Sequence, residues 1–512
     1  MYQSLLTRKY LFSKVMPLLA SLSVMLCTAM VLITWSVMGG FSTQLFSIGR
    51  SMIGDVTIAW PVIGIPHYEA LIKTLEADPM VEAATPTIEA MGLLAIPPPP
   101  GSSVVEPRTV QVIGVEPEGY DKVTGFYDRI WWKHLAKPLP HDTDKLDQRL
   151  IIPEVSQIEL DGRTLTKPDP KTGVPRPAIV VGTQVTKYNQ RTREGYINPP
   201  YPAMFAPNLE PTISVLPLSA KNVVIELQSR ALPIANEFYS GLYESDANWI
   251  IMPLNILQKM LKLDAAQKTD PNDKGGTIVR DPATGRETIR PPKVIGVEPA
   301  RATNILVKAK PGITPDQLRE RVRQIYDTFS ADPARIKVMP PSDRVLIFTW
   351  EHKPGLETFI AAVKHETVMV LVIFSFISLT AVFLVLSIFW SMVAEKTKDI
   401  GVLRAMGASG LGVAWLWVRY GLIIGVVGSI LGGIVTYLVI NNINAIHEWL
   451  GAKLGIVIWD PSVYYFTEIP ARVNPLHAAI VLSGGILWCA LGAFVPAFRA
   501  ARMDPVKALR FE

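Results

Sequence analysis

The sequence predicts a membrane protein with four transmembrane α-helices, one before and three after a large inserted α+β domain outside the cytoplasm. Two observations predict this fold class. Four long stretches are almost free of Lys, Arg, Asp and Glu, and each is long enough to cross a hydrocarbon core of about 30 Å as a helix. Most of the 42 prolines lie between Pro61 and Pro354, which sets a polar block apart from the apolar ends.

The first apolar stretch is interpreted as a permanent anchor. Its apolar part, residues 15–38, is longer than the 7–15 residues typical of the apolar core of a signal peptide. No A-x-A-like cleavage site follows Met38, where the chain reads Gly39-Gly40-Phe41. The other three spans are assigned to residues 366–394, 412–440 and 475–498.

Lys and Arg in the short segments beside the spans predict the orientation, because cytoplasmic segments carry an excess of both residues. Lys and Arg are frequent in residues 1–14 and 499–512 and in the segment after the second span, which carries Lys396, Lys398, Arg404 and Arg419. The loop at 441–474 has only two basic residues against three acidic ones. We therefore expect both termini and residues 395–411 to be cytoplasmic. Residues 39–365 form the exterior α+β domain, and residues 441–474 form a loop on the same side.

The third span carries glycines at steps of four, three and four residues, which places them on one helical face: Gly421, Gly425, Gly428 and Gly432. Small residues at this spacing let helix backbones approach closely in lipid. The face could pack within one four-helix bundle or form a subunit interface in a dimer. The spans contain no acidic residue or lysine in their cores, which argues against transport driven by a proton or sodium gradient.

The exterior block mixes strand-like and helix-like patterns. Strands are predicted at Val110–Val115, Ala178–Val181 and Val223–Leu227. A helix is predicted at Asp316–Thr328, with Thr314 as N-cap and Pro315 in the first turn. Pro97–Pro100 predicts a polyproline II segment, and Asp264–Pro292 predicts a mobile insertion.

The sequence contains no motif for catalysis or metal binding. It lacks G-x-S-x-G, H-E-x-x-H and C-x-x-C, and its seven histidines are scattered without metal-ligand spacing. It also lacks the G-x-x-x-x-G-K-[ST] loop, so we expect no cofactor of its own and a separate subunit to bind any ATP. The net charge of +5 includes no basic stripe that would favour nucleic acid. The protein is therefore not expected to be an enzyme.

The segment after the second span, residues 395–411, is predicted to contain a short amphipathic helix. Ile400, Leu403 and Gly407 share one face of it. The charged residues occupy the other side: Glu395, Lys396, Lys398, Asp399 and Arg404. The helix could lie on the bilayer surface, but its mixed charge favours docking of a cytoplasmic partner, because surface helices usually present a basic polar face.

Two long motifs carry a resemblance to a known family. Glu395–Ser409 reads E-K-T-K-D-I-G-V-L-R-A-M-G-A-S, and Pro496–Glu512 reads P-A-F-R-A-A-R-M-D-P-V-K-A-L-R-F-E. Together they resemble the FtsX-like permease family of ABC transporters, the type that includes the macrolide exporter. Within it, the permeases of the lipoprotein-releasing system are most similar. Val37–Phe41 resembles their V-M-N-G-F, with Gly39 in place of Asn, and Gly241–Asp246 resembles their G-M-Y-E-Y-D.

The resemblance implies a permease subunit in the inner membrane, paired with a second permease chain, identical or different, and with cytoplasmic ATPase subunits. Residues 395–411 would then couple ATP hydrolysis to work on the periplasmic side. Lipoprotein release is the implied task, with membrane lipids, a lipoprotein cargo and a periplasmic carrier as further partners. The alternatives are export of a lipid, peptide or drug, and division-type signalling to a cell-wall hydrolase.

Overall fold

The computed structural model describes residues 15–97, 107–133, 155–186, 190–192, 195–197, 210–217, 226–240, 243–270, 278–280, 287–289, 293–333, 335–336, 338–354, 356–456, 469–502 and 504. The chain forms two compact units. The membrane unit comprises Met1–Leu45, Thr358–Asp460 and Glu468–Glu512. The sheet unit comprises Phe46–Glu357 and Pro461–Thr467.

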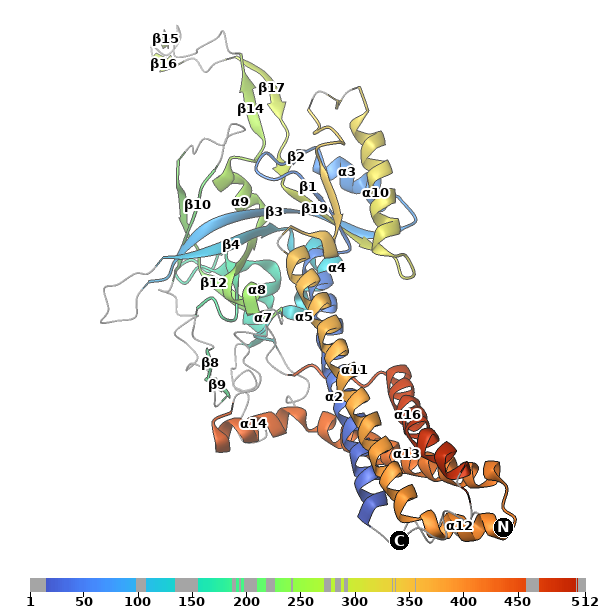
Figure 1. Ribbon diagram of the computed structural model, residues 1–512. Coiled ribbons are helices and arrows are strands. Elements are labelled where there is room, and N and C mark those ends of the chain that lie inside the picture. The colour runs from blue at the N-terminus through green and yellow to red at the C-terminus, as the bar shows by residue number, and fades with distance from the viewer. Residues whose placement is uncertain are drawn as a thin grey trace. The chain divides into compact units, whose positions relative to one another are not determined.

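Four described helices contain an apolar stretch long enough to cross a membrane. They are α2 (Val15–Ile53), α11 (Leu356–Glu395), α13 (Gly410–Asn441) and α16 (Pro475–Ala501), shown in Figure 1. The described residues between them include two shorter helices, α12 (Thr397–Ala405) and α14 (Ile443–Leu454). The predicted fold class, one span before and three after a domain rich in β-structure, is confirmed.

The helices do not begin and end where the predicted spans do. The helix α2 continues past Met38 to Ile53, and α11 begins at Leu356, before the predicted span at 366–394. Hydropathy predicts the part of a helix that suits lipid, whereas backbone hydrogen bonding can continue into polar sequence. The segment 441–474, predicted as a loop, contains the helix α14.

A large mixed sheet organises the sheet unit, and ten described strands belong to it. Along the sheet the order is β12 (Ile234–Phe238), β7 (Ile179–Gly182), β13 (Trp249–Pro253), β4 (Arg108–Val115), β3 (Val81–Ala95), β19 (Asn304–Ala309), β1 (Val56–Ala59) and β20 (Leu346–Thr349). The strand β10 (Thr212–Val215) pairs with β3 and with β11 (Gln228–Ala231). Most pairs are antiparallel, but β12–β7 and β13–β4 are parallel.

The long strand β3 connects two separate hydrophobic cores. Its first half pairs with β19, and its second half pairs with β4 (Figure 1). One core lies between β1, β19 and β20 and the helices α3 (Tyr68–Glu76) and α10 (Pro315–Ser330). The other lies between β4, β7, β12 and β13 and the helices α7 (Val155–Thr164) and α9 (Leu254–Leu261).

The remaining described elements of the sheet unit are small. The helices are α4 (Pro117–Thr124), α5 (Phe126–Arg129), α8 (Tyr243–Asn248) and the 3-10 turn η1 (Trp350–His352). The two-stranded ribbons are β2–β18 (Ile65–Pro66, Arg301–Ala302), β5–β6 (Thr166–Pro168, Pro175–Pro177), β8–β9 (Gln190–Thr192, Gly195–Ile197), β14–β17 (Ala266–Thr269, Val294–Glu298) and β15–β16 (Ile278–Arg280, Glu287–Ile289).

Two predicted strands and one predicted helix of this unit are present in the structure. The predicted strands at Val110–Val115 and Ala178–Val181 correspond to β4 and β7, and the predicted helix corresponds to α10. Thr314 caps α10 in a full capping box with Gln317. Most of Val223–Leu227 and of Pro97–Pro100 lies outside the described residues. The predicted insertion starts as an ordered ribbon, because β14 pairs with β17.

Gly54 and Asp55 connect α2 to the first strand of the sheet, β1. Gly54 has φ +75°, a left-handed conformation that a side chain would strain. The buried carboxylate of Asp55 accepts a hydrogen bond from the Ala309 amide at 2.7 Å, while the Asp55 carbonyl accepts one from the Trp350 amide at 3.2 Å. Because β1 and β20 pair directly, the strand that follows α2 and the strand that leads towards α11 are neighbours.

Asp78 ties the end of α3 to α10 and gives the sheet unit a pH-dependent contact. Its side chain is almost fully buried, and Oδ2 lies 2.7 Å from Nε of Arg321. Burial by itself would raise the pKa of Asp78, but hydrogen bonds from the Met80 amide and Arg321, with the Arg321 charge, lower it overall. The folded state therefore favours the charged carboxylate.

We expect Asp78→Asn to destabilise the protein at neutral pH. The depressed pKa means that the stabilisation is present above the unfolded pKa, near 3.9, and is lost as the pH falls through the lower folded value. The difference in melting temperature between wild type and variant, measured in detergent, should therefore shrink on acidification below about pH 4. A difference that stays constant down to pH 3 would contradict this role.

Candidate functional site

The segment between α11 and α13 folds into a short helix held between two sharp turns. The helix α12 begins at Thr397, two residues after α11 ends, and stops at Ala405. Gly407 then adopts φ +96°, which favours glycine and reverses the chain. Ser409 caps α13, its hydroxyl accepting a hydrogen bond from the Gly412 amide at 3.1 Å.

One side of α12 is anchored to the helix bundle. Ile400 is buried in the core of the membrane unit, in one cluster with Val393 of α11 and Val413 and Trp417 of α13. The Thr397 hydroxyl donates to the carbonyl of Ala394 at 2.7 Å. These contacts fix α12 to the ends of α11 and α13, so a force applied to α12 acts on both helices.

Three other positions of this segment carry large apolar side chains that are exposed to a considerable extent. Val402, Met406 and Leu411 are 46%, 71% and 84% exposed, and we call these three residues the outward group. Lys398 and Asp399 beside them are exposed as well. The segment thus combines an anchored side with an exposed, mixed apolar and charged side, as a docking surface requires.

The three residues predicted to share one face of the docking helix differ in burial. Of the predicted trio, Ile400 is buried, Leu403 is half-buried, and Gly407 is exposed beyond the end of the helix. Three of the charged residues have local partners: Lys396 pairs with Asp399 at 2.9 Å, and Arg404 donates to the Ala408 carbonyl at 3.2 Å. Glu395 and Lys398 are exposed. The outward group was not predicted from the sequence, although Val402 and Met406 lie four residues apart, a spacing that places two side chains on one helical face.

The glycine face of α13 packs within the chain, against two different helices. A Cβ at Gly421 would lie 2.6 Å from that of Ala493, and one at Gly425 would lie 3.0 Å from that of Cys489, both on α16. A Cβ at Gly428 would lie 2.7 Å from that of Val24 on α2. Gly432 packs in the same way against α2. All four glycines therefore serve close helix packing in this chain.

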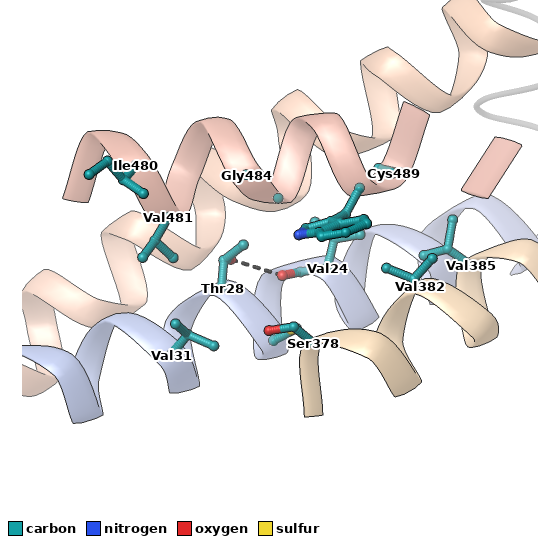
Figure 2. Close-up of a pocket in the computed structure, with 13 residues that line it drawn as sticks. Val24, Thr28, Val31, Ser378, Val382, Val385, Ile480, Val481, Gly484 and Cys489 are labelled. Atoms are coloured by element: carbon teal, nitrogen blue, oxygen red, sulfur yellow. Dashed lines mark hydrogen bonds between the residues drawn. The ribbon is translucent and has the colours of Figure 1, made fainter. Parts of the chain in front are cut away.

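An apolar cavity of about 230 Å³ lies between α2, α11 and α16. Figure 2 shows valines from all three helices around it, with the Thr28 hydroxyl turned back to the Val24 carbonyl at 2.8 Å. The lining residues are Val24, Cys27, Thr28, Val31, Ser378, Val382, Val385, Ile480, Val481, Gly484, Gly485, Trp488 and Cys489. None of these is ionisable at neutral pH, so the cavity suits an apolar group better than an ion.

One residue of the motif in the sheet unit, Asp246, has a structural role. In the Gly241–Asp246 segment, the carboxylate of the buried Asp246 accepts a hydrogen bond from the Ser240 amide at 2.7 Å, whereas Gly241 and Leu242 lie outside the described residues. Over the described part of the chain, no three His, Cys, Asp or Glu side chains gather closely enough to hold a metal ion.

The four long apolar helices define a multi-pass membrane protein. Residues 371–505, which run from α11 past the end of α16, match the family described as FtsX-like permease C-terminal. This match includes residues of the last three of the four long helices, so the resemblance to FtsX-like permeases rests on the C-terminal part of the chain.

Similar proteins include the lipoprotein-releasing system transmembrane protein LolC of Xylella fastidiosa, which is 27% identical over 152 residues. That match covers 30% of this chain and 37% of the relative. LolC of Haemophilus influenzae is 26% identical over 38% of this chain and 47% of its own length. The ABC transporter permease YtrF of Bacillus subtilis is 30% identical over 31% of this chain and 35% of its own. The chain thus spans less than half the length of these relatives.

A comparison of structures finds the periplasmic region of MacB from Actinobacillus actinomycetemcomitans, at 8% identity and a TM-score of 0.27. The match covers 59% of this chain and 92% of that one.

Proposed function

We propose that this chain is the permease subunit of an ABC transporter in the inner membrane, and that a separate cytoplasmic ATPase subunit docks on the outward group. The observation that carries the proposal is the position of this group. Val402 lies on the helix that Ile400 anchors in the bundle, Met406 follows directly after that helix, and Leu411 lies in the first turn of α13. All three are inside the residues that match the permease family. The chain itself supplies the transmission, and the partner binds and hydrolyses ATP.

The packing around α12 supports this transmission. The core that holds Ile400 also contains residues of all four long helices, among them Val24, Phe389, Tyr420 and Ala493. Close-packed interiors transmit displacement because they contain little free volume. Movement of α12 would therefore shift α2 and α11. In the chain, β1 follows α2 and β20 precedes α11, and these two strands pair with each other. Work is then done by the sheet unit on the periplasmic side.

We further propose that the cargo is a lipoprotein, released from the inner membrane to a periplasmic carrier with the help of a second permease chain. The names of the LolC relatives support this cargo. The apolar cavity supports it independently, because an acyl chain of a lipid-modified protein is the kind of group that an uncharged lining accepts.

Depletion of the chain in its native host tests the cargo. We expect outer-membrane lipoproteins to accumulate in the inner-membrane fraction of a density gradient, because their acyl chains would no longer be extracted. Outer-membrane β-barrel proteins, which carry no acyl chain, provide the control and should keep their distribution. If lipoproteins sort as before depletion, release is excluded. Retention of a drug or free lipid in those cells would then identify the chain as an exporter.

A further inference from the structure

Among the described helices of the membrane unit, α14 is the one with no buried residue. It starts one residue after α13 ends, with Asn442 between them, and Gly455 ends it in a left-handed conformation at φ +67°. Its sequence is Ile-Asn-Ala-Ile-His-Glu-Trp-Leu-Gly-Ala-Lys-Leu.

Contacts between α13 and α2 place the start of α14 at a defined depth. Both helices run in the same direction, since Gly428 lies against Val24 and the Thr436 hydroxyl donates to the Ala29 carbonyl at 3.4 Å. Continuing this register along α2 brings the start of α14 level with the segment from about Ser36 to Gly40.

The chain that leads into α16 lies at the same depth. The Arg472 amide donates to the Ser36 carbonyl at 3.2 Å, and Gly40 packs against Pro470. The Ile469 amide donates to Oδ1 of Asn444 at 2.9 Å. The helix α14 therefore starts at the edge of the apolar bundle, where α13 has ended and α16 has not yet begun. We call this depth the boundary level.

The helix α14 is amphipathic. Ile443, Ile446, Leu450 and Leu454 recur at the spacing of one helical face, and Trp449 extends that face. Glu448 lies on the opposite side, together with Asn444, which holds Ile469. The apolar side is uncovered, because Ile446, Trp449 and Leu454 are 39%, 58% and 59% exposed. Figure 1 shows α14 extending sideways from the bundle, away from α2 and α16.

We propose that α14 lies in the plane of the membrane interface, with its apolar side set into the boundary between the headgroups and acyl chains of phospholipids. An amphipathic helix at the boundary level has water on one side and lipid on the other, which its two faces match. Trp449 is the residue type enriched at this depth. Lys453, on the apolar side, can lay its methylene chain along that surface and keep its ammonium group among the phosphates.

Such a helix fixes the position of α13 along the membrane normal. The end of α13 and the segment before α16 are joined through Asn444 and Ile469, so lipid contact at α14 holds both. The bundle would then resist sliding through the bilayer when α12 is pushed.

Labelling at single positions tests the proposal in the full chain. In a Cys27→Ala, Cys489→Ala background, a fluorescent NBD group is attached to Ile446→Cys, Trp449→Cys or Glu448→Cys. Each protein is reconstituted in vesicles of phosphatidylcholine and phosphatidylglycerol. The three positions are exposed, so the label displaces no packed side chain. Quenching by iodide reports water, and quenching by lipids spin-labelled near the headgroup reports the interface.

We expect the lipid quencher to act severalfold more strongly at residues 446 and 449 than at residue 448, and iodide to show the reverse order. Equal and strong iodide quenching at all three positions would mean that α14 lies in water and would overturn the proposal. Protection of residues 446 and 449 from both quenchers would overturn it as well, because protein would then cover the apolar side.

Discussion

Gly432→Val should prevent stable packing of the membrane helices, whereas Gly433→Val on the same helix should be tolerated. A Cβ at Gly432 would meet the Thr28 side chain and would lie 2.9 Å from the backbone oxygen of Met25. At Gly433 the nearest atoms would be those of the Leu482 side chain, at 3.6 Å, which is ordinary contact. Both variants carry the same cost in helix propensity, so their difference isolates the contact with α2.

The loss of stability expected for Gly432→Val depends on whether the atoms that face the new side chain can move away. Overpacking a well-packed core costs about 1–3 kcal/mol, and more where the obstacle is backbone. Thr28 cannot turn away easily, because its hydroxyl is bonded to the Val24 carbonyl at 2.8 Å. Gly432→Val should therefore show a melting temperature in detergent many degrees below that of wild type, or fail to accumulate in membranes. Equal melting temperatures for the two variants would show that α2 and α13 do not pack through Gly432.

The sequence was sufficient to predict the glycine face of α13 but not the helices that pack against it. The spacing of Gly421, Gly425, Gly428 and Gly432 was sufficient to predict a close-packed face, because that is a local property of one helix. It could not reveal that the face is shared, with the first two glycines against α16 and the last two against α2. The partners come from distant parts of the chain, and the crossing of three helices decides which glycine meets which.

In the segment around α12, by contrast, the predicted helical face itself was wrong. A helical projection of residues 395–411 placed Ile400, Leu403 and Gly407 together, because it assumed one continuous helix. The left-handed Gly407 ends that helix early, and the bundle buries Ile400. In the sheet unit, α10 could be predicted from its own cap and apolar stripe, whereas the order of the strands around β3 could not, since most of its partners are far away in the chain.

Met406→Asp should separate the permease from its proposed ATPase partner while leaving the fold intact. The Met406 side chain is 71% exposed and contributes little to the packing of the chain itself. In a docked complex it would be buried, and burying a Met side chain contributes about 1.5–3 kcal/mol. An unpaired carboxylate at the same place would have to lose its hydration, which costs several kcal/mol more. Leu403 and Gly407 are less suitable positions, because Leu403 is half-buried and Gly407 has φ +96°.

The measurement is the ATPase activity that copurifies with the full-length chain from native membranes. Since each 1.4 kcal/mol is about a tenfold change in affinity, Met406→Asp should reduce this activity by tenfold or more. Met91→Asp provides a matched control, because Met91 is 64% exposed on β3, in the other unit. It should retain the activity of wild type, and both variants should keep its melting temperature. Wild-type levels of copurified ATPase activity in Met406→Asp would exclude the outward group as the docking surface. Loss of the activity in both variants would mean that either substitution disturbs assembly of the complex, and would contradict a specific role of Met406.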